Sequence, residues 1–464
     1  MNTQDTICAI ATAQGGAIGV IRISGKDAIA ITDRIFTPVG KHPLPLSERK
    51  AYTMAFGHIR QDDGEIIDEV LIGLFKSPHS YTGEDCVEIS CHGSSFILQQ
   101  VMQLLIRKGC RAAGPGEFTQ RAFLNGKMDL SQAEAVADLI ASSSAATHRM
   151  AVNQMRGGFS RELSALRERL LHLTSLMELE LDFSDHEELE FADRSELETI
   201  AGDIEKVISG LVHSFSVGNV LKNGIPVAIV GETNAGKSTL LNTLLNEEKA
   251  IVSDIHGTTR DVIEDTVNLS GITFRFIDTA GIRDTHDTIE NMGIARSFHK
   301  MEQAEIVLWV IDNTCAEAQI RQLSPRILPL CSNKQLIILL NKSDQVSAVP
   351  TKLSGLPENT VTLSISAKEK TGIQELQNLL VKTASVPELT SSDLIVTNVR
   401  HYEALSLALE DIHRVQNGLQ THLSGDFISQ DLRECLFHLA EIVGGEITAD
   451  EVLGNIFMKF CIGK

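Results

Sequence analysis

Residues 225–238 read IPVAIVGETNAGKS, and this stretch decides the fold of the segment around it. Its first six residues form a short apolar run, which is typical of a buried strand. The next eight match G-x-x-x-x-G-K-[ST], a loop whose backbone N–H groups surround phosphate oxygens. A helical pattern begins at Ser238. Because the motif lies between a strand and a helix, the context it requires, we predict a phosphate-binding loop here.

Two residues of this loop have predicted chemistry. The Lys237 ammonium would reach the β- and γ-phosphates of a nucleotide, and the Ser238 hydroxyl would ligate Mg²⁺. The glycines let backbone N–H groups turn inward, and the N-terminus of the following helix adds positive potential.

Four further apolar runs follow, separated for the most part by helical patterns: residues 273–277, 306–311, 336–340 and 361–365. Strands that alternate with helices favour a largely parallel sheet with right-handed connections. We therefore predict a Ras-like P-loop domain, with a parallel-type sheet and flanking helices.

Short polar sequences follow three of these runs: DTAG at 278–281, NKSD at 341–344 and SAK at 366–368. Asp278 would hold Mg²⁺ through water, and the Gly281 N–H would approach the γ-phosphate. The acceptor-only carboxylate of Asp344 matches the N1–H and 2-amino donors of guanine, which selects GTP over ATP. A backbone N–H of 366–368 would meet the guanine O6. In this order these sequences predict a guanine-nucleotide-binding domain, with the Thr259 hydroxyl completing the Mg²⁺ shell.

Ile282 follows the DTAG sequence, at a position where many GTPases have a glutamine that orients the attacking water. Isoleucine cannot polarise water, so another group must do so, or hydrolysis is negligible. Acidic residues at 284, 287 and 290 follow, and solvated loop charge is the default interpretation of any one of them.

The remainder of the chain is of two kinds. The first 120 residues or so indicate mixed α/β structure, with strand patterns at 18–23 and 87–91 and a helical pattern at 96–107. Residues 131–218 and those from 393 onward are helical in pattern. The simplest architecture joins the two helical stretches into one domain, into which the sheet domain is inserted.

Composition restricts the function classes. The 464 residues are 43% hydrophobic and 22% charged, an ordinary globular composition. We expect no transmembrane helix and no signal peptide, and the eight scattered cysteines favour free thiols in a reducing compartment, here the cytoplasm. A formal charge of −20 repels nucleic acid at long range, so a nucleic-acid partner would need a local basic patch or a partner protein.

Six segments outside the nucleotide motifs carry a resemblance to a known family. They are DTI at 5–7, GVIRISG at 19–25, YTGED at 81–85, PGEFT at 115–119, RAFLNGKMDL at 121–130 and FCIGK at 460–464. Together with the nucleotide motifs they resemble the tRNA-modification GTPases of the MnmE (TrmE) family, related to Era, and the resemblance runs from end to end.

The resemblance implies a multidomain α+β and α/β protein. Residues 1–126 would be an α/β folate-binding and dimerisation domain, 127–218 and 385–464 an all-α helical domain, and 219–384 the G domain. The protein would be a homodimer. With an MnmG-like FAD protein, in a heterotetramer or larger complex, it would add a carboxymethylaminomethyl-type group at C5 of the wobble uridine of certain tRNAs. A 5-formyl- or 5,10-methylene-tetrahydrofolate would supply one carbon, and K⁺ would aid G-domain dimerisation.

The resemblance also assigns residues. Glu290 would orient the attacking water and act with Lys237 in catalysis. K⁺ would bind Asn234, Ser253, Ile255 and Thr258, doing the charge-stabilising work of an arginine finger beside the phosphates. Folate would contact Arg22, Glu88, Lys127 and Lys464. The full predicted GTP set is Asn234, Ala235, Gly236, Lys237, Ser238, Thr239, Ser253, Asp254, Ile255, His256, Gly257, Thr258, Thr259, Asp278, Thr279, Ala280, Gly281, Asn341, Lys342, Asp344, Ser366, Ala367 and Lys368.

Some residues depart from the family pattern or remain open. Gly114 stands where the family commonly has arginine, so a cationic contact is expected to be missing. Cys461 is a candidate nucleophile, but an inert thiol near the folate pocket is an equal alternative. Cys86, Cys91 and His92 lack zinc-ligand spacing, and we interpret them as strand-borne packing residues. For Arg22 and Lys127 the structural alternative is a surface ion pair.

Two other functions are weighed. An Era-like RNA-binding GTPase switch in ribosome assembly would need a basic domain beside the G domain, whereas the flanks here are acidic. A stand-alone folate-dependent transferase leaves the complete G domain unexplained.

Overall fold

The computed structural model describes residues 5–13, 15–40, 43–182, 194–248, 265–277, 301–332, 334–346, 355–357, 360–384, 394–445 and 463. The chain divides into two compact units. The first comprises Met1–Ala141, Ala151–Ser209 and Glu403–Lys464, and the second Ser142–Met150 and Gly210–Tyr402. The first unit includes both N-terminal and helical segments, so the bounds of the four sequence-based segments stay predictions.

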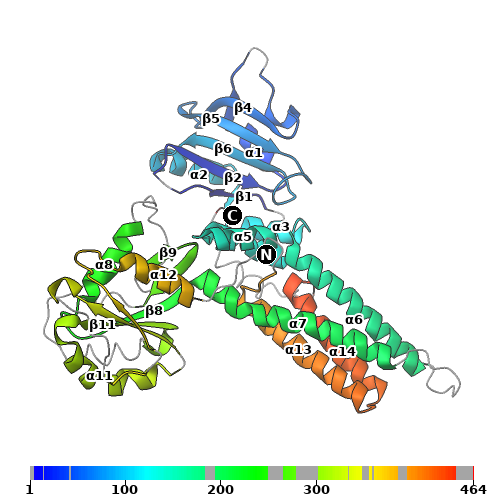
Figure 1. Cartoon of the computed structure of the whole chain (residues 1–464). Helices are drawn as coiled ribbons and strands as arrows, with labels where there is room; N and C mark the ends of the chain where they lie inside the picture. Colours follow the sequence, from blue (N-terminus) through cyan, green and yellow to red (C-terminus); the bar gives the residue numbers. More distant parts are fainter. Residues whose placement is uncertain are drawn as a thin grey trace. The chain divides into compact units, whose positions relative to one another are not determined.

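A seven-stranded sheet forms the N-terminal part of the first unit (Figure 1). Its order is β3-β4-β5-β6-β2-β1-β7, and every neighbouring pair is antiparallel except β1 with β7. The strands are β1 (Ile7–Ile10), β2 (Ile18–Ser24), β3 (Phe36–Pro38), β4 (Thr53–Arg60), β5 (Ile66–Phe75), β6 (Cys86–His92) and β7 (Arg111–Ala112). The strand and helix patterns at 18–23, 87–91 and 96–107 are thus confirmed.

Helices cover one face of this sheet. Alternating strand residues such as Ile21, Ile72 and Ile89 are fully buried, together with Leu98 and Leu104 of helix α2 (Ser95–Arg107). Helix α1 (Ala28–Asp33) and the short helix η1 (Leu46–Glu48) add to the same core. Because side chains alternate along a strand, the residues between the buried ones lie on the opposite face. That face matters for the proposed function below.

Long helices from two distant stretches of the chain form a bundle (Figure 1). Helix α14 packs along α6, and the Arg433 guanidinium pairs with Glu178 across 2.7 Å. Leucines at helical spacing, among them Leu163, Leu170 and Leu439, are buried. The prediction that both flanks build one helical domain is confirmed. The long helices of the bundle are α6 (Gly158–Asp182), α7 (Arg194–Asn223), α13 (Val399–Gln420) and α14 (Gly425–Val443). Three shorter helices, α3 (Glu117–Leu124), α4 (Leu130–Ala141) and α5 (Ala145–Met155), precede α6 in the chain.

The second unit contains a six-stranded sheet in the order β13-β12-β11-β8-β10-β9. All neighbouring pairs are parallel except β9 with β10, so the predicted parallel-type sheet is confirmed. The strands are β8 (Ile225–Val230), β9 (Asp265–Leu269), β10 (Ile272–Phe276), β11 (Ile306–Asp312), β12 (Gln335–Asn341) and β13 (Val361–Ser364).

Both faces of this second sheet are buried. On β11, Leu308 and Val310 enter one core with α8 (Lys237–Glu248) and α12 (Ile373–Thr383). Trp309 and Ile311 enter the other core with α11 (Ala316–Leu330). Burial on two sides explains the uninterrupted apolar runs of the sequence. Because these strands run parallel, the carboxyl ends of β8, β11, β12 and β13 lie at one edge of the sheet, where loops can bind a ligand.

Among the described residues, no helix has both the length and the apolar content needed to span a bilayer.

Candidate functional site

The predicted phosphate loop connects β8 to α8. Gly231 has φ +146°, and a Cβ there would lie 2.1 Å from the Val310 carbonyl oxygen, so only glycine fits against β11. Gly236 has φ +96°, and its Cβ would lie 2.2 Å from the Asn341 side-chain nitrogen. Asn234 adopts a left-handed conformation at φ +64° and is exposed. The backbone therefore has the inward turn that a phosphate cradle needs.

Lys237 lies over its own loop. Its Nζ donates to the carbonyl oxygens of Gly231 at 2.8 Å and Glu232 at 2.7 Å. Burial lowers the pKa of this ammonium, and the nearby Glu232 carboxylate opposes the shift. A group of phosphate anions in the loop would favour the charged form and supply the counter-charge that burial removes.

Asn341 connects the phosphate loop to the loop after β13. The residue is 3% exposed, and its Nδ2 donates to the Ala235 carbonyl at 2.8 Å while its Oδ1 accepts the Ala367 N–H at 3.0 Å. The Thr243 hydroxyl of α8 donates to the Ala367 carbonyl at 3.0 Å. Three of the predicted sequence segments are thus held together by buried hydrogen bonds.

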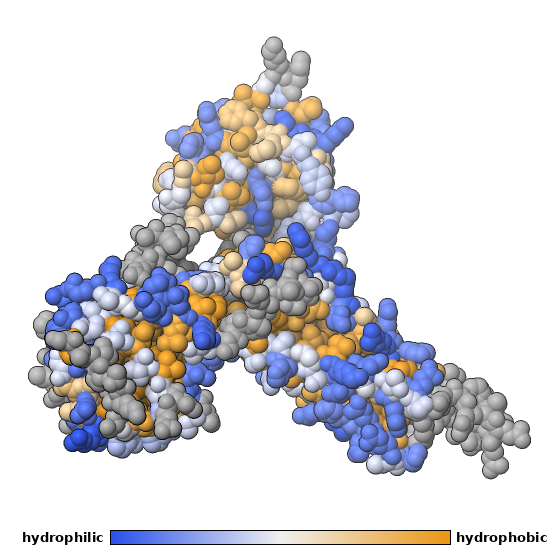
Figure 2. Space-filling view, in the orientation of Figure 1, coloured by the Kyte–Doolittle hydropathy of each residue, from blue (hydrophilic) through white to orange (hydrophobic). Residues whose placement is uncertain are grey.

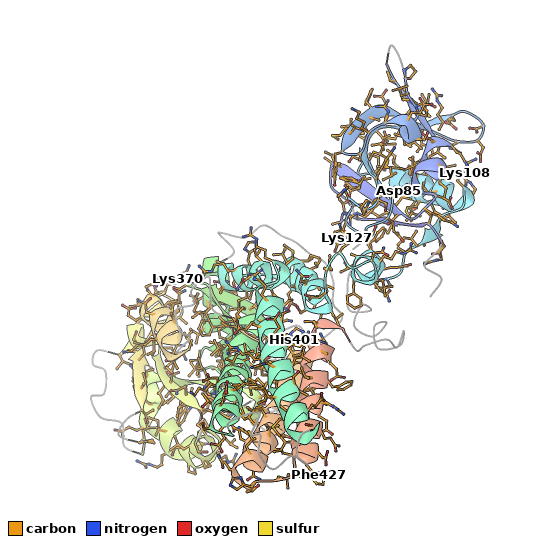
Figure 3. All side chains as sticks on the ribbon, turned by 90° about the vertical axis from the view of Figure 1, so that its right-hand side faces the viewer. Asp85, Lys108, Lys127, Lys370, His401 and Phe427 are labelled. Atoms are coloured by element: carbon orange, nitrogen blue, oxygen red, sulfur yellow. The ribbon has the colours of Figure 1, made fainter. Side chains whose placement is uncertain are left out.

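The predicted base-recognition residues also come together. The Ser366 hydroxyl donates to Asp344 Oδ1 at 2.7 Å and accepts the Glu369 N–H at 3.2 Å, so the serine orients the exposed carboxylate. The Ala367 N–H already donates to Asn341, and it would meet a guanine O6 only by sharing or giving up that bond. Lys370, labelled in Figure 3, belongs to the same turn.

Sequence reasoning missed Asp312, the last residue of β11. Its Oδ2 lies 2.6 Å from Lys342 Nζ. The available signal was positional, because Asp312 and Asn341 end adjacent parallel strands and are partners in register.

In the N-terminal sheet, the predicted folate residues Arg22 and Glu88 contact each other. They are partners in register on β2 and β6, and two guanidinium nitrogens donate to Glu88 Oε1 at 2.9 and 2.8 Å. The guanidinium carbon lies 5.4 Å from the centre of the Tyr81 ring and 5.7 Å from that of Phe118. Arg22 also donates to the Gly463 carbonyl at 3.5 Å, which brings the C-terminal segment to this site.

Lys127 makes a different contact. This exposed residue, labelled in Figure 3, donates from Nζ to the Pro78 carbonyl at 3.0 Å. Arg22 thus forms an ion pair, as the structural alternative expects, whereas among the described residues Lys127 bonds to a backbone carbonyl and to no carboxylate.

A buried ion network in the N-terminal part of the chain connects four of the segments that carry the family resemblance: 5–7, 81–85, 115–119 and 121–130. Arg121 is 3% exposed and binds carboxylates of Asp5, Glu84 and Glu117 at 2.8 to 3.2 Å. Arg111 donates to Glu117 at 2.5 and 3.0 Å, and the Gly114 N–H donates to Glu117 Oε2 at 2.8 Å. The carboxylate beside Gly114 thus has two guanidinium partners although residue 114 itself offers no cation.

Comparisons with known proteins agree along the whole chain. The model of the MnmE helical domain matches residues 130–461, and that of the GTP-binding protein TrmE N-terminus matches residues 6–127. Proteins called tRNA modification GTPase MnmE from Bacteroides thetaiotaomicron and Bacteroides fragilis are each 66% identical, over 99% of this chain and 100% of their own. The protein of that name from Flavobacterium johnsoniae is 52% identical over 100% of both chains. The chain belongs to the MnmE family of tRNA modification GTPases.

Membership in the MnmE family establishes a GTPase, which binds GTP with Mg²⁺. The described donors fit both groups: Lys237 and the turned backbone suit the phosphates, and the Ser238 hydroxyl is a hard oxygen ligand at the start of α8. The solved structure of Aquifex aeolicus Era is similar over 40% of this chain and 66% of its own, with 28% identity and a TM-score of 0.27. At that TM-score the similarity adds nothing to the assignment.

Several MnmE-type predictions fall outside the described residues. They are the switch segment 253–259, the DTAG segment 278–281, Ile282, Glu290, Cys461 and Lys464. Four of the six predicted metal ligands lie in these segments, so the roles of their residues stay predictions.

The cysteine cluster separates into two cases. Cys86 and Cys91 are 2% and 4% exposed, as expected of packing residues. Burial raises the pKa of their thiols to about 12 and about 11, so both thiols stay protonated at neutral pH. His92 contradicts our interpretation, because its side chain is 71% exposed and its Nδ1 lies 2.7 Å from Asp68 Oδ1. The strand end at His92 lets the ring turn outward to this carboxylate. No group of three metal-ligating side chains occurs in the described part of the chain.

Proposed function

We propose that this chain uses GTP hydrolysis to modify tRNA. With an MnmG-like flavoprotein it would add a carboxymethylaminomethyl-type group at C5 of the wobble uridine. The observation that carries this proposal is the 66% identity, over 99% of the chain, to proteins named for tRNA modification. The assembled base and phosphate loops supply the GTPase half of the function. A cytoplasmic location follows from a tRNA substrate.

For hydrolysis we propose that charge stabilisation comes from Lys237, Mg²⁺ and K⁺. Ser238 and Thr259 would hold Mg²⁺, with Asp278 acting through water. Asn234, Ser253, Ile255 and Thr258 would hold K⁺, and the exposed amide of Asn234 at the loop surface is available for this role. Glu290 would orient the attacking water, which the apolar Ile282 cannot do. A positive charge beside the phosphates stabilises the negative charge of the transition state.

For the N-terminal domain we propose a folate pocket at Arg22, Glu88, Lys127 and Lys464. Two aromatic rings beside a half-buried guanidinium suit a flat, anionic ligand. The second oxygen of Glu88 would accept hydrogen bonds from the amino-pyrimidine edge of a pterin, while the cations would meet the glutamyl carboxylates. Bound tetrahydrofolate would supply the one-carbon unit.

We propose a homodimer through the face of the N-terminal sheet opposite α1 and α2, beyond the end near β1 where Phe118 of α3 packs. Ile18 and Met54 are both 66% exposed, and Phe56 and Leu71, which are partners in register, are 46% and 43% exposed. Figure 2 shows apolar surface over these strands. An apolar patch that remains open on a monomer is typical of a protein–protein contact. Arg22 lies on this same face by register, so the pocket and the dimer contact would be neighbours.

The deciding experiment is mass spectrometry of tRNA nucleosides from cells that lack this protein. We expect the wobble-uridine modification to disappear, to return with the wild-type gene and not to return with Lys237→Ala. Intact modification in the deleted strain would refute the proposal and favour the Era-like RNA-binding switch instead.

A further inference from the structure

Asp312 and Lys342 form an ion pair at the edge where nucleotide loops gather. Asp312 ends β11, and Lys342 follows the end of β12, one residue after the register partner of Asp312. Lys342 has φ +61° and ψ +40°, a left-handed conformation that residues other than glycine rarely adopt. Its Nζ lies 2.6 Å from Asp312 Oδ2. A tertiary contact of this kind can hold such a turn.

The carboxylate of Asp312 is itself fixed. Its Oδ1 accepts the Thr314 N–H at 3.0 Å and the Thr314 hydroxyl at 2.7 Å, and its own N–H donates to the Gln319 side chain at 3.0 Å. Burial raises the pKa of Asp312, but the bonds from Lys342 and Thr314 outweigh it and hold the pKa below its ordinary value. The side chains of Asp312 and Lys342 are 14% and 28% exposed, so solvent screens this pair less than a surface pair.

The turn at Lys342 separates two residues that point to different partners. Asn341, before it, bonds to the phosphate loop through Ala235. Asp344, two residues after it, bonds to Ser366 and is our candidate for reading the guanine edge. The backbone at Lys342 therefore sets the direction of the Asp344 carboxylate relative to the phosphate loop.

We propose that Asp312 is a positioning residue for guanine recognition and acts through Lys342. Its charge holds the ammonium, the ammonium holds the left-handed turn, and the turn directs Asp344. This inference rests on the proposed base-reading role of Asp344. It extends the recognition site to a residue outside the NKSD segment, on a neighbouring strand.

The inference predicts a nucleotide-selective defect. Inosine lacks the 2-amino group of guanine, so the ratio of IDP to GDP dissociation constants measures how well a carboxylate meets that group. Asp312→Asn keeps the size of the side chain and an acceptor for Thr314 but removes the charge. We expect it to weaken GDP binding about tenfold, the scale of one charge-assisted hydrogen bond, and to weaken IDP binding less, because inosine keeps the N1–H donor but has no 2-amino group to lose.

The experiment measures both dissociation constants with the full-length chain and Mg²⁺, by competition against a fluorescent GDP analogue. Variants are Asp312→Asn, Lys342→Met, the double variant, and Thr314→Val as the matched control. Thr314→Val removes one bond to the same carboxylate without touching the ion pair, and we expect an unchanged IDP-to-GDP ratio. If Asp312 acts through Lys342, Asp312→Asn adds no further change in the Lys342→Met background.

Two results would overturn the inference: equal weakening of GDP and IDP, or additive effects in the double variant. If Asp312→Asn does not fold, Lys342→Met decides alone, since it breaks the same ion pair, and an unchanged IDP-to-GDP ratio then refutes the proposal. Asp344→Asn, measured in parallel, tests the base-reading role separately. If that variant keeps the wild-type ratio, the underlying function has failed rather than the role of Asp312.

Discussion

The side-chain amide of Asn341 donates to the backbone carbonyl of Ala235 across 2.8 Å. Ala235 is fully buried within the phosphate loop that follows β8. Asn341 is the last residue of β12, which is separated from β8 in the sheet by β11. The same side chain accepts the Ala367 N–H on its other side. The phosphate loop and the loop predicted to contact the base are therefore connected through one buried side-chain amide.

Replacing this amide tests the connection. Asn341→Ala leaves the Ala367 N–H and the Ala235 carbonyl without their partner, and an unsatisfied buried group costs about 1–3 kcal/mol. We expect lower thermal stability of the G domain and GDP affinity reduced at least about tenfold. Calorimetry measures both. Thr243→Val, which removes the hydroxyl bonds to the Thr239 and Ala367 carbonyls but leaves both bonds of Asn341 in place, is the control and should have the smaller effect on GDP affinity.

Asp344→Asn tests base recognition. The amide side chain offers a donor where guanine also has donors, while xanthine offers an acceptor at its 2-oxo group. We expect the preference to shift from GTP toward xanthosine triphosphate. Competition binding with both nucleotides measures the shift, and an unchanged preference for GTP would remove Asp344 from the recognition site. Ser366→Ala, which frees the carboxylate but keeps its charge, should retain GTP over xanthosine triphosphate.

The sequence predicted those features that local pattern controls. The run at 225–230 became β8 with the same bounds, because β10 and β11 pair with its two edges and the cores on both faces of the sheet bury alternate side chains. The glycines of the phosphate loop have the positive φ that a tight turn requires, and close contacts with the Val310 carbonyl and the Asn341 side chain exclude a Cβ at Gly231 and Gly236.

Other features depend on pairs that are distant in sequence. Asp312 and Lys342 are 30 residues apart, and a lone acid at a strand end resembles any solvated residue until the sheet order is known. His92 was wrongly taken for a packing residue because alternation predicts which face a residue occupies, not that a terminal ring turns to a carboxylate such as Asp68. The Arg22–Glu88 ion pair also depends on strand pairing. The sequence offered an ion pair only as an alternative for Arg22, and the register of β2 with β6 places Glu88 directly opposite it.

The proposed K⁺ site predicts a dependence on the cation. GTP hydrolysis should be faster in KCl than in NaCl at equal ionic strength, because the smaller Na⁺ fits a K⁺-sized ligand shell poorly. Phosphate release under single-turnover conditions measures the rates. Asn234→Ala should remove most of the difference between the two salts. Equal wild-type rates would count against Asn234 as a cation ligand.

Glu290→Ala separates binding from turnover. A residue that orients water contributes to the transition state and little to ground-state binding, so we expect near-normal GDP affinity with turnover reduced about a hundredfold or more. Glu290→Gln keeps the length and part of the hydrogen-bonding capacity and should be less impaired. Near-normal hydrolysis by Glu290→Ala would exclude this glutamate from the mechanism, and another residue would then have to replace the function missing at Ile282.

Glu117 predicts how the N-terminal domain responds to acid. Burial alone raises the pKa of Glu117, but bonds from Arg111, the Gly114 N–H and Arg121 outweigh it and lower the pKa below 4.5. Since the folded-state pKa is the lower one, stability from this carboxylate is present above the unfolded-state pKa and is lost as pH falls through the folded value. At pH 7, Glu117→Gln should therefore lower the free energy of unfolding by about 1–3 kcal/mol and the midpoint temperature with it. The difference in midpoint temperature between the variant and the wild type should narrow toward pH 3. A difference that stays constant with pH would mean that packing of the side chain, and not its charge, stabilises the network.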